Sequence, residues 1–243
     1  MPRLADLLAR NLDISRTAAA RLIAEGRVTH RDGTPLADRN TELPAGDAAA
    51  PAVPVSVDGE AVSLWDRAVI LQHKPVGVVT ALRDNRHPTA YDLLAEAPLH
   101  GSLRAVGRLD LDSSGLLLWT TEGALIQRLT HPKRRVPRTY HAALARPFAP
   151  LPPDLALEDG HRPEIEALAE LAPGDAHVAL AVPDGAAVLA SITIIGGAYH
   201  EVRRIFAALG SHVLALCRIS FGAYRLPADL PAGDWRAVPP PTT

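Results

Sequence analysis

Residues 107–119, GRLDLDSSGLLLW, decide how the chain folds, because two apolar segments there flank a short polar one. The apolar segments predict buried strands, and the polar residues between them predict a loop. Burying a carboxylate costs several kcal/mol unless it is paired, so Asp110 requires a cation or backbone N–H groups close by. Taken alone, the stretch allows three interpretations: a turn capped by Asp110, a hard-metal site formed with Asp112, or a reactive carboxylate held by an arginine such as Arg108.

The composition is typical of a soluble globular protein with one large core. The chain has 243 residues, of which 47% are hydrophobic and 21% are charged. No apolar run is long enough to span a membrane, and Arg3 and Asp6 precede any apolar stretch, so we expect neither a membrane span nor a secretory signal. The single cysteine, Cys217, excludes an intrachain disulfide, and no Cys/His cluster has zinc spacing. We therefore expect a cytoplasmic monomer without a bound metal.

The net charge of −2 conceals a segregation of charge along the chain. Residues 104–146 carry eight Arg and Lys against three Asp and Glu, and residues 200–225 carry four against one. Residues 151–190 have the opposite balance, one against eight. A polyanion would bind the first two segments, if they share a surface, and avoid the third. The alternative is a solvated charged face with no partner.

The N-terminal residues predict a small unit of their own at residues 1–60. Leucines at helical spacing predict a first helix, and Ser15 is a favourable N-cap for a second helix that Gly26 ends. A short strand is expected at Val28–His30. Residues 44–59 are rich in Ala, Pro and Gly, which indicates a linker with one edge strand at Val53–Val57.

The remaining residues, 61–243, alternate between strand and helix patterns and predict a second unit. We expect one helix at Gly123–Thr130, a second around Val202–Leu209, and a turn at His73–Pro75. The expected strands are Ala68–Leu71, Val78–Thr80, Arg104–Gly107, Leu116–Trp119, Arg138–Leu144, Ser191–Ile195 and Val213–Ile219. This pattern predicts an α+β fold with a largely antiparallel mixed sheet and flanking helices.

Two residues outside the opening stretch are further candidates for chemistry. Tyr140 follows the basic run PKRRVPRT; a strand tyrosine is usually part of the core, but one behind a basic cluster can also stack on a nucleobase. Arg203 lies off the apolar stripe of its helix, directly after Gly196–Gly197. It is either solvated or aimed at an anion near the helix N-terminus.

Four motifs occur together and in a fixed order along the chain. They are HKPVGVVTA (73–81), GRLDLDSSGLLLWTTEGAL (107–125), RTYHAAL (138–144) and GGAYHEVRRIFAALGSHVLALCRISFG (196–222). Their combination resembles the ribosomal-RNA pseudouridine synthases, in particular the small-subunit branch. The N-terminal unit is similar to the S4-type RNA-binding module that this branch carries. The chain departs from the family pattern at Ala198, where relatives often have arginine, and at Trp119, where smaller aliphatic residues are expected.

The resemblance implies roles for individual residues. Asp110 corresponds to the catalytic aspartate, Tyr140 to the active-site tyrosine and Arg203 to the basic residue that pairs with the aspartate. The resemblance further implies that Leu216 lines an apolar pocket wall and that Arg108 contacts the substrate. The expected RNA contacts are Arg138, Lys133, Arg134, Arg135, Arg3, Ser15 and Arg16.

The implied reaction is isomerisation of a uridine to pseudouridine in ribosomal RNA, with the 16S RNA or a small-subunit assembly intermediate as the expected partner. Nothing is oxidised and no group is added, so the reaction requires no redox cofactor or energy source. A 23S RNA target and a non-catalytic S4-type RNA-binding or ribosome-assembly role are the alternatives. A metal-dependent phosphoryl transfer through Asp110 and Asp112 is a third, which activity in the presence of a chelator would exclude.

Overall fold

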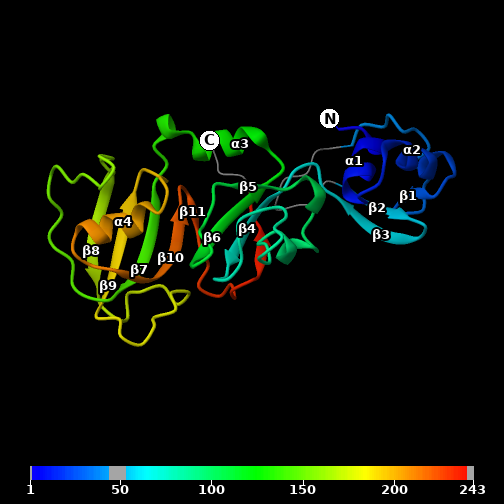
Figure 1. Ribbon diagram of the computed structural model, residues 1–243. Coiled ribbons are helices and arrows are strands. Elements are labelled where there is room, and N and C mark those ends of the chain that lie inside the picture. Colours follow the sequence, from blue (N-terminus) through cyan, green and yellow to red (C-terminus); the bar gives the residue numbers. More distant parts are fainter. Residues whose placement is uncertain (1, 44–52, 240–243) are drawn as a thin grey trace.

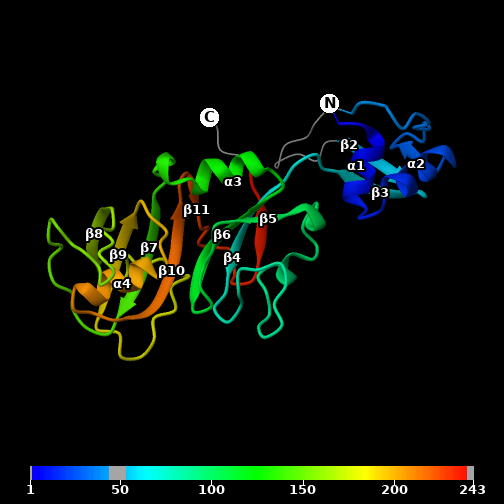
Figure 2. The same ribbon diagram turned by 45° about the horizontal axis from the view of Figure 1, so that its top comes forward.

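The computed structural model describes residues 2–43 and 53–239 and divides them into two units (Figures 1 and 2). A small N-terminal unit lies to one side of a larger unit built on a long, twisted sheet, and both views show the two as separate bodies. Within the described ranges, no helix has the length and apolar character needed to cross a lipid bilayer.

The small unit packs two helices on a three-stranded antiparallel sheet. Its elements are α1 (Leu4–Asn11), α2 (Arg16–Ala24), β1 (Val28–His30), β2 (Val53–Val57) and β3 (Glu60–Leu64), with strand order β1-β2-β3. The expected cap of α2 is confirmed, because the Ser15 hydroxyl accepts a hydrogen bond from the Ala18 N–H at 3.1 Å. The expected boundary at residue 60 falls at the start of β3, which pairs with β2 over Glu60–Leu64.

The two units are joined by hydrogen bonds at the end of β3. The Asn11 side chain donates to the Trp65 carbonyl at 2.9 Å and accepts from the Trp65 N–H at 2.8 Å. Arg10 donates to the Asp66 carbonyl at 2.7 Å. The C-terminus of α1 is therefore fixed to the segment that enters the large sheet.

The large sheet has nine strands and is mostly antiparallel. The strands are β4 (Val69–Lys74), β5 (Arg104–Val106), β6 (Ser113–Thr120), β7 (Arg138–Leu144), β8 (Ile165–Leu171), β9 (Val188–Ile194), β10 (Val213–Phe221), β11 (Tyr224–Arg225) and β12 (Trp235–Ala237). The main order is β12-β4-β6-β10-β7-β9-β8, with β5 paired to β6 and β11 to β10. Among the described strands, β6 and β10 form the one parallel pair. The predicted α+β class with a mixed, largely antiparallel sheet is confirmed.

Helices cover both faces of this sheet because side chains alternate along each strand. On one face, Ile205 and Phe206 of α4 (Glu201–Ala208) belong to a buried apolar cluster that includes Ala142 of β7 and Ile192 of β9, and the Phe206 ring packs edge-on against Phe148. On the opposite face, α3 (Gly123–Thr130) packs its leucines against the intervening residues of β6 and β10. Short 3₁₀ helices at Asp92–Leu94, His100–Ser102 and Pro132–Arg134 lie in the connections.

Three local predictions are wrong. The strand at Val53–Val57, expected at an edge, is the central strand of the small sheet, because it pairs with both β1 and β3. His73 and Lys74 lie in β4 and are buried, whereas a turn was expected there. Residues 78–80, expected as a strand, form only an isolated bridge between Val79 and Thr89. The reason is that residues 75–81 bond to the loop after β5 instead of to a strand: Thr80 exchanges hydrogen bonds with the Leu109 backbone.

The parallel pair brings two backbones unusually close at Gly115. This residue is in register with Arg218 and has a φ of +107°. A Cβ atom at residue 115 would overlap the Arg218 carbonyl oxygen and lie 2.6 Å from the Arg218 nitrogen. Only glycine allows β6 to approach β10 at this point.

Candidate active site

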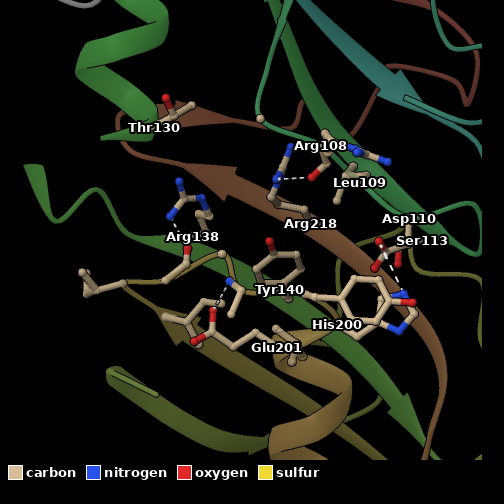
Figure 3. Close-up of a pocket in the computed structure, with 18 of the residues that line it drawn as sticks. Arg108, Leu109, Asp110, Ser113, Thr130, Arg138, Tyr140, His200, Glu201 and Arg218 are labelled. Atoms are coloured by element: carbon tan, nitrogen blue, oxygen red, sulfur yellow. Dashed lines mark hydrogen bonds and ion pairs between the residues drawn. The ribbon is translucent and has the colours of Figure 1, made fainter. Parts of the chain in front are cut away.

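A cavity of about 660 Å³ opens where the parallel pair meets the N-terminus of α4. Its walls come from the loop before β6, from β7 and β10, from the end of α3 and from the turn before α4. Figure 3 shows Asp110 and His200 at one end of this cavity, with Arg138 and Thr130 at the other. Segments far apart in the sequence therefore converge, including three of the four motifs identified above.

Asp110 lies in the loop between β5 and β6, and its side chain is 40% exposed. The backbone of this loop is held from the segment after β4. Thr80 exchanges hydrogen bonds with Leu109, and the Gly77 N–H donates to the Leu111 carbonyl at 2.8 Å. The carboxylate is therefore presented to the cavity on a backbone that is already ordered, as an active site requires.

Lys74 also holds the loop that carries Asp110. Its side chain is buried, and its Nζ atom donates to the carbonyls of Pro75 at 2.9 Å, Asp110 at 2.9 Å and Ser113 at 2.8 Å. An ammonium group has three N–H donors, so all three are used. Burial lowers the pKa of Lys74 to about 8, although the nearby Asp110 and Asp112 carboxylates oppose this shift.

We expect activity to fall as Lys74 loses its proton. A neutral amine has two N–H groups for three carbonyls, so the loop that carries Asp110 loses one of its bonds. The value of kcat should fall by up to about tenfold between pH 7 and 9, because the protonated fraction declines above a pKa of about 8. The measurement is a pH profile of the reaction that the motif resemblance implies, isomerisation of uridine in a short transcript.

The matched variant Lys74→Met should be less active and should lack this alkaline decline. The free energy of unfolding of the wild type should change in the opposite direction to its activity as the pH rises. An unfolded lysine keeps its proton to about pH 10.4, so the folded protein binds fewer protons than the unfolded chain between pH 8 and that value. The free energy of unfolding of the wild type should therefore rise with pH in this window relative to the variant. An alkaline decline of the same size in Lys74→Met would assign it to another group.

Arg218 is a second buried cation at the floor of the cavity. It is 2% exposed, and its Nε atom donates to the Leu116 carbonyl at 2.8 Å and its Nη1 atom to the Arg108 carbonyl at 3.3 Å. The guanidinium also lies 5.1 Å from the centre of the Phe221 ring. Its Nη2 atom is buried and has no partner among the described residues. The interpretation of the sequence missed this residue, although an arginine inside an apolar strand required a polar partner.

Tyr140 and Leu216 lie where the sequence predicted, at the cavity wall. Tyr140 is on β7, is 7% exposed and is in register with Arg218 on β10, so both side chains face the same side of the sheet. Leu216 is 6% exposed and lies opposite Ser113 in the parallel pair. An aromatic ring and an aliphatic side chain thus border the space beside Asp110.

Arg203 lines the cavity, but it does not pair with Asp110 as expected. Its Nη2 atom lies 3.0 Å from the Asp112 Oδ2 atom and donates to the Asp112 carbonyl, and its Nη1 atom donates to the Val213 carbonyl at 3.2 Å. The two aspartates lie two residues apart in the same loop, and sequence spacing could not decide which one the helix reaches. Among the described residues, the basic side chain within ion-pair distance of Asp110 is His200, whose Nε2 atom is 3.7 Å from the Asp110 Oδ1 atom.

The pairing of Asp112 also bears on the metal interpretation. A site shared by Asp110 and Asp112 would need both carboxylates, but Arg203 occupies one of them. Within residues 2–43 and 53–239, no group of three or more His, Cys, Asp and Glu side chains could hold a metal ion. The described donors therefore do not fit the two-carboxylate magnesium site that the sequence left open.

The residues expected to contact RNA are in different surroundings. Lys133 and Arg134 are exposed near the cavity, whereas Arg135 is in an ion pair with Glu164. Arg108 and Arg138 line the cavity, and the Arg138 guanidinium lies 4.5 Å from the centre of the Phe221 ring. Arg3, Ser15 and Arg16 belong to the small unit and do not line the cavity; Ser15 caps α2 and Arg16 pairs with Asp6.

A carboxylate and an aromatic ring in a cavity lined by four arginines are groups expected at an enzyme site for an anionic substrate. The comparisons with known proteins specify the class. The family model for RNA pseudouridylate synthases matches residues 68–208. A protein from Aquifex aeolicus described as an uncharacterized RNA pseudouridine synthase is 33% identical over 240 residues, covering 97% of this chain and 92% of its own.

The ribosomal small subunit pseudouridine synthase A of Escherichia coli is 32% identical over 237 residues, covering 97% of this chain and 96% of its own. A crystal structure of a pseudouridylate synthase is similar with a TM-score of 0.56 and 26% identity, covering 98% of this chain and 96% of its own. The chain therefore belongs to the RNA pseudouridylate synthase family, and it is an RNA pseudouridine synthase. The family resemblance of the four motifs is confirmed.

Proposed function

We propose that this enzyme converts one uridine of the small-subunit ribosomal RNA to pseudouridine. The observation that carries the proposal is similarity over 97% of the chain to a protein named for that activity, the small-subunit synthase of E. coli. The four arginines of the cavity support it, because a polynucleotide brings phosphates wherever it brings a base.

Asp110 is proposed as the catalytic residue. The reaction breaks the bond between uracil N1 and ribose C1′, forms a bond between C5 and C1′, and moves the C5 proton away while N1 gains one. A carboxylate can attack C1′ or remove a proton from the sugar, and Asp110 is positioned for either role by the bonds that hold its loop. The substrate supplies all the atoms of the product, so the reaction consumes no redox cofactor and no group donor.

Tyr140 and Leu216 are proposed to hold the uracil while it is detached. The target base must leave its stack to enter the cavity, and a buried aromatic ring offers it a new stacking surface. Tyr140 can also assist removal of the C5 proton. Leu216 excludes water from the wall opposite Ser113. Arg203 is proposed to act through the loop, by fixing Asp112 next to Asp110.

The small unit is proposed to be an S4-type RNA-binding module. It presents exposed arginines, among them Arg16, whose side chain is 82% exposed, and Arg21, whose side chain is 79% exposed. The hydrogen bonds from α1 to Trp65 and Asp66 fix it to the large unit, so RNA bound to the module could be directed to the cavity.

The test is to map pseudouridine in both ribosomal RNAs from cells with and without the gene, and in a 16S transcript treated with the purified protein. We expect one site in the 16S RNA to depend on the gene and activity to persist in a chelator. A dependent site in the 23S RNA would overturn the proposed target. Unchanged RNA with an assembly defect would favour the non-catalytic alternative.

A further inference from the structure

Tyr199 is an exposed aromatic residue at the edge of the catalytic cavity. Its exposed fraction is 77%, the highest among the large apolar side chains that the structure describes. Its ring stacks on the His200 ring with a centroid distance of 3.9 Å and an interplanar angle of 16°. His200 covers one face of the tyrosine, and the high exposure leaves the other face open to solvent.

The turn that presents Tyr199 is held in place from beneath. Glu201 is 4% exposed, and its Oε2 atom accepts a hydrogen bond from the Ala198 N–H at 3.0 Å. Its Oε1 atom lies 2.8 Å from the His161 ring nitrogen. The carboxylate lies so close to Gly196 that a Cβ atom there would overlap it. An aromatic ring on an ordered turn loses little conformational entropy when a ligand stacks on it.

The location of Tyr199 relates it to the substrate. Its neighbour His200 is 3.7 Å from Asp110, and both aromatic residues line the cavity. Tyr140, by contrast, is 7% exposed and lies inside the cavity. The structure thus offers one buried ring next to the reacting carboxylate and a second, solvent-exposed ring at the entrance.

We propose that the open face of Tyr199 is a stacking platform for an unpaired base that flanks the target nucleotide. The proposal rests on the function of the enzyme as an RNA pseudouridine synthase. When the target base enters the cavity, its neighbours in a single-stranded segment lose their stacking partner and remain at the entrance. An aromatic ring accepts any base face, so Tyr199 adds affinity without reading sequence. The arginines of the cavity favour the phosphates that connect these bases.

The experiment uses short RNAs that contain the mapped target uridine, each with one abasic nucleotide at a single flanking position. Binding is measured by fluorescence anisotropy in the Asp110→Asn background, so that the RNA is not converted. Without further substitution, an abasic nucleotide at one flanking position should weaken binding roughly tenfold. When Tyr199→Ala is added, binding of the intact RNA should weaken by a similar factor. The doubly substituted protein should then bind the RNA that is abasic at that position as tightly as it binds the intact RNA. Tyr199→Phe should bind like the tyrosine parent.

A kinetic measurement separates this role from a structural one. With Asp110 present, Tyr199→Ala should raise KM for the RNA roughly tenfold with a smaller change in kcat. Val178→Ala is the matched control, because Val178 is 75% exposed and does not line the cavity. It should leave binding unchanged.

Two binding results would overturn the proposal. In one, Tyr199→Ala binds the intact RNA as tightly as its parent. In the other, its loss of affinity is the same for every abasic RNA, which would mean that no base is coupled to the ring. If the wild type forms no pseudouridine in any RNA, the proposed function fails instead. If the wild type and Tyr199→Ala both form pseudouridine with the same KM, the stacking platform is refuted and the proposed function stands.

Discussion

Replacing Asp110 with asparagine is expected to lower pseudouridine formation by on the order of 10⁴-fold. The amide has nearly the same shape as the carboxylate but cannot attack C1′ or accept a proton as the carboxylate does. The backbone of the loop should be unaffected, because Lys74 and Thr80 hold it through main-chain atoms. The measurement is product formation in a transcript under single-turnover conditions, with anisotropy to confirm that the RNA still binds.

Asp112→Asn is the matched control for this prediction. Asp112 lies in the same loop, but its side chain is 64% exposed and pairs with Arg203. Its replacement should reduce activity far less than the change at Asp110, since Arg203 keeps its bond to the Val213 carbonyl. If Asp110→Asn folds normally, binds RNA and still forms pseudouridine at a comparable rate, Asp110 is not the catalytic residue.

Gly115→Ala is expected to lower the free energy of unfolding by about 3 kcal/mol or more. The added methyl group would overlap the Arg218 backbone, and alanine rarely adopts the positive φ of this position. The strands β6 and β10 would have to separate where they join the two parts of the sheet. Activity should fall as well, because the displaced Arg218 supports the Arg108 carbonyl. Urea denaturation followed by circular dichroism measures the first effect.

Gly123→Ala provides the comparison. Gly123 begins α3, and a Cβ atom there would have no neighbour within 4 Å. Alanine is favoured over glycine in a helix, so this variant should be as stable as the wild type or more stable by up to about 1 kcal/mol. Equal stability of the two alanine variants would show that the close approach at Gly115 is relieved elsewhere in the sheet.

The sequence predicts most of the regular elements because their periodicity is strong. The helices α3 and α4, the strand β7 and the Ser15 cap lie where apolar periodicity and capping chemistry placed them. The exposed strand β8 was missed, since Glu166 and Glu170 interrupt its apolar residues. Local patterns cannot reveal a strand that is defined mainly by its pairing with β9.

The residues that line the candidate site were predictable, whereas the contacts between them were less so. Asp110, Tyr140, Leu216 and Arg203 all line one cavity, as the motifs implied. The prediction that Arg203 pairs with Asp110 was wrong. Two aspartates lie in the same loop, and only the tertiary structure shows that Arg203 reaches Asp112. Lys74 was assigned to a turn because proline follows it, although the preceding apolar run continues the strand.

The parallel pairing of β6 with β10 also determines when the large sheet can be completed during synthesis of the chain. Residues 121–212 separate the two strands, so the ribosome completes β4, β5 and β6 long before their partner emerges. Until then one edge of β6 remains open, and such edges are prone to mispairing. The loop of Asp110 gains the bond from Arg218 to the Arg108 carbonyl, and the cavity gains its floor, only when nearly the whole chain has been made. A chain that lacks β10 also lacks Leu216 and Arg218 at the cavity, and we expect it to form no pseudouridine.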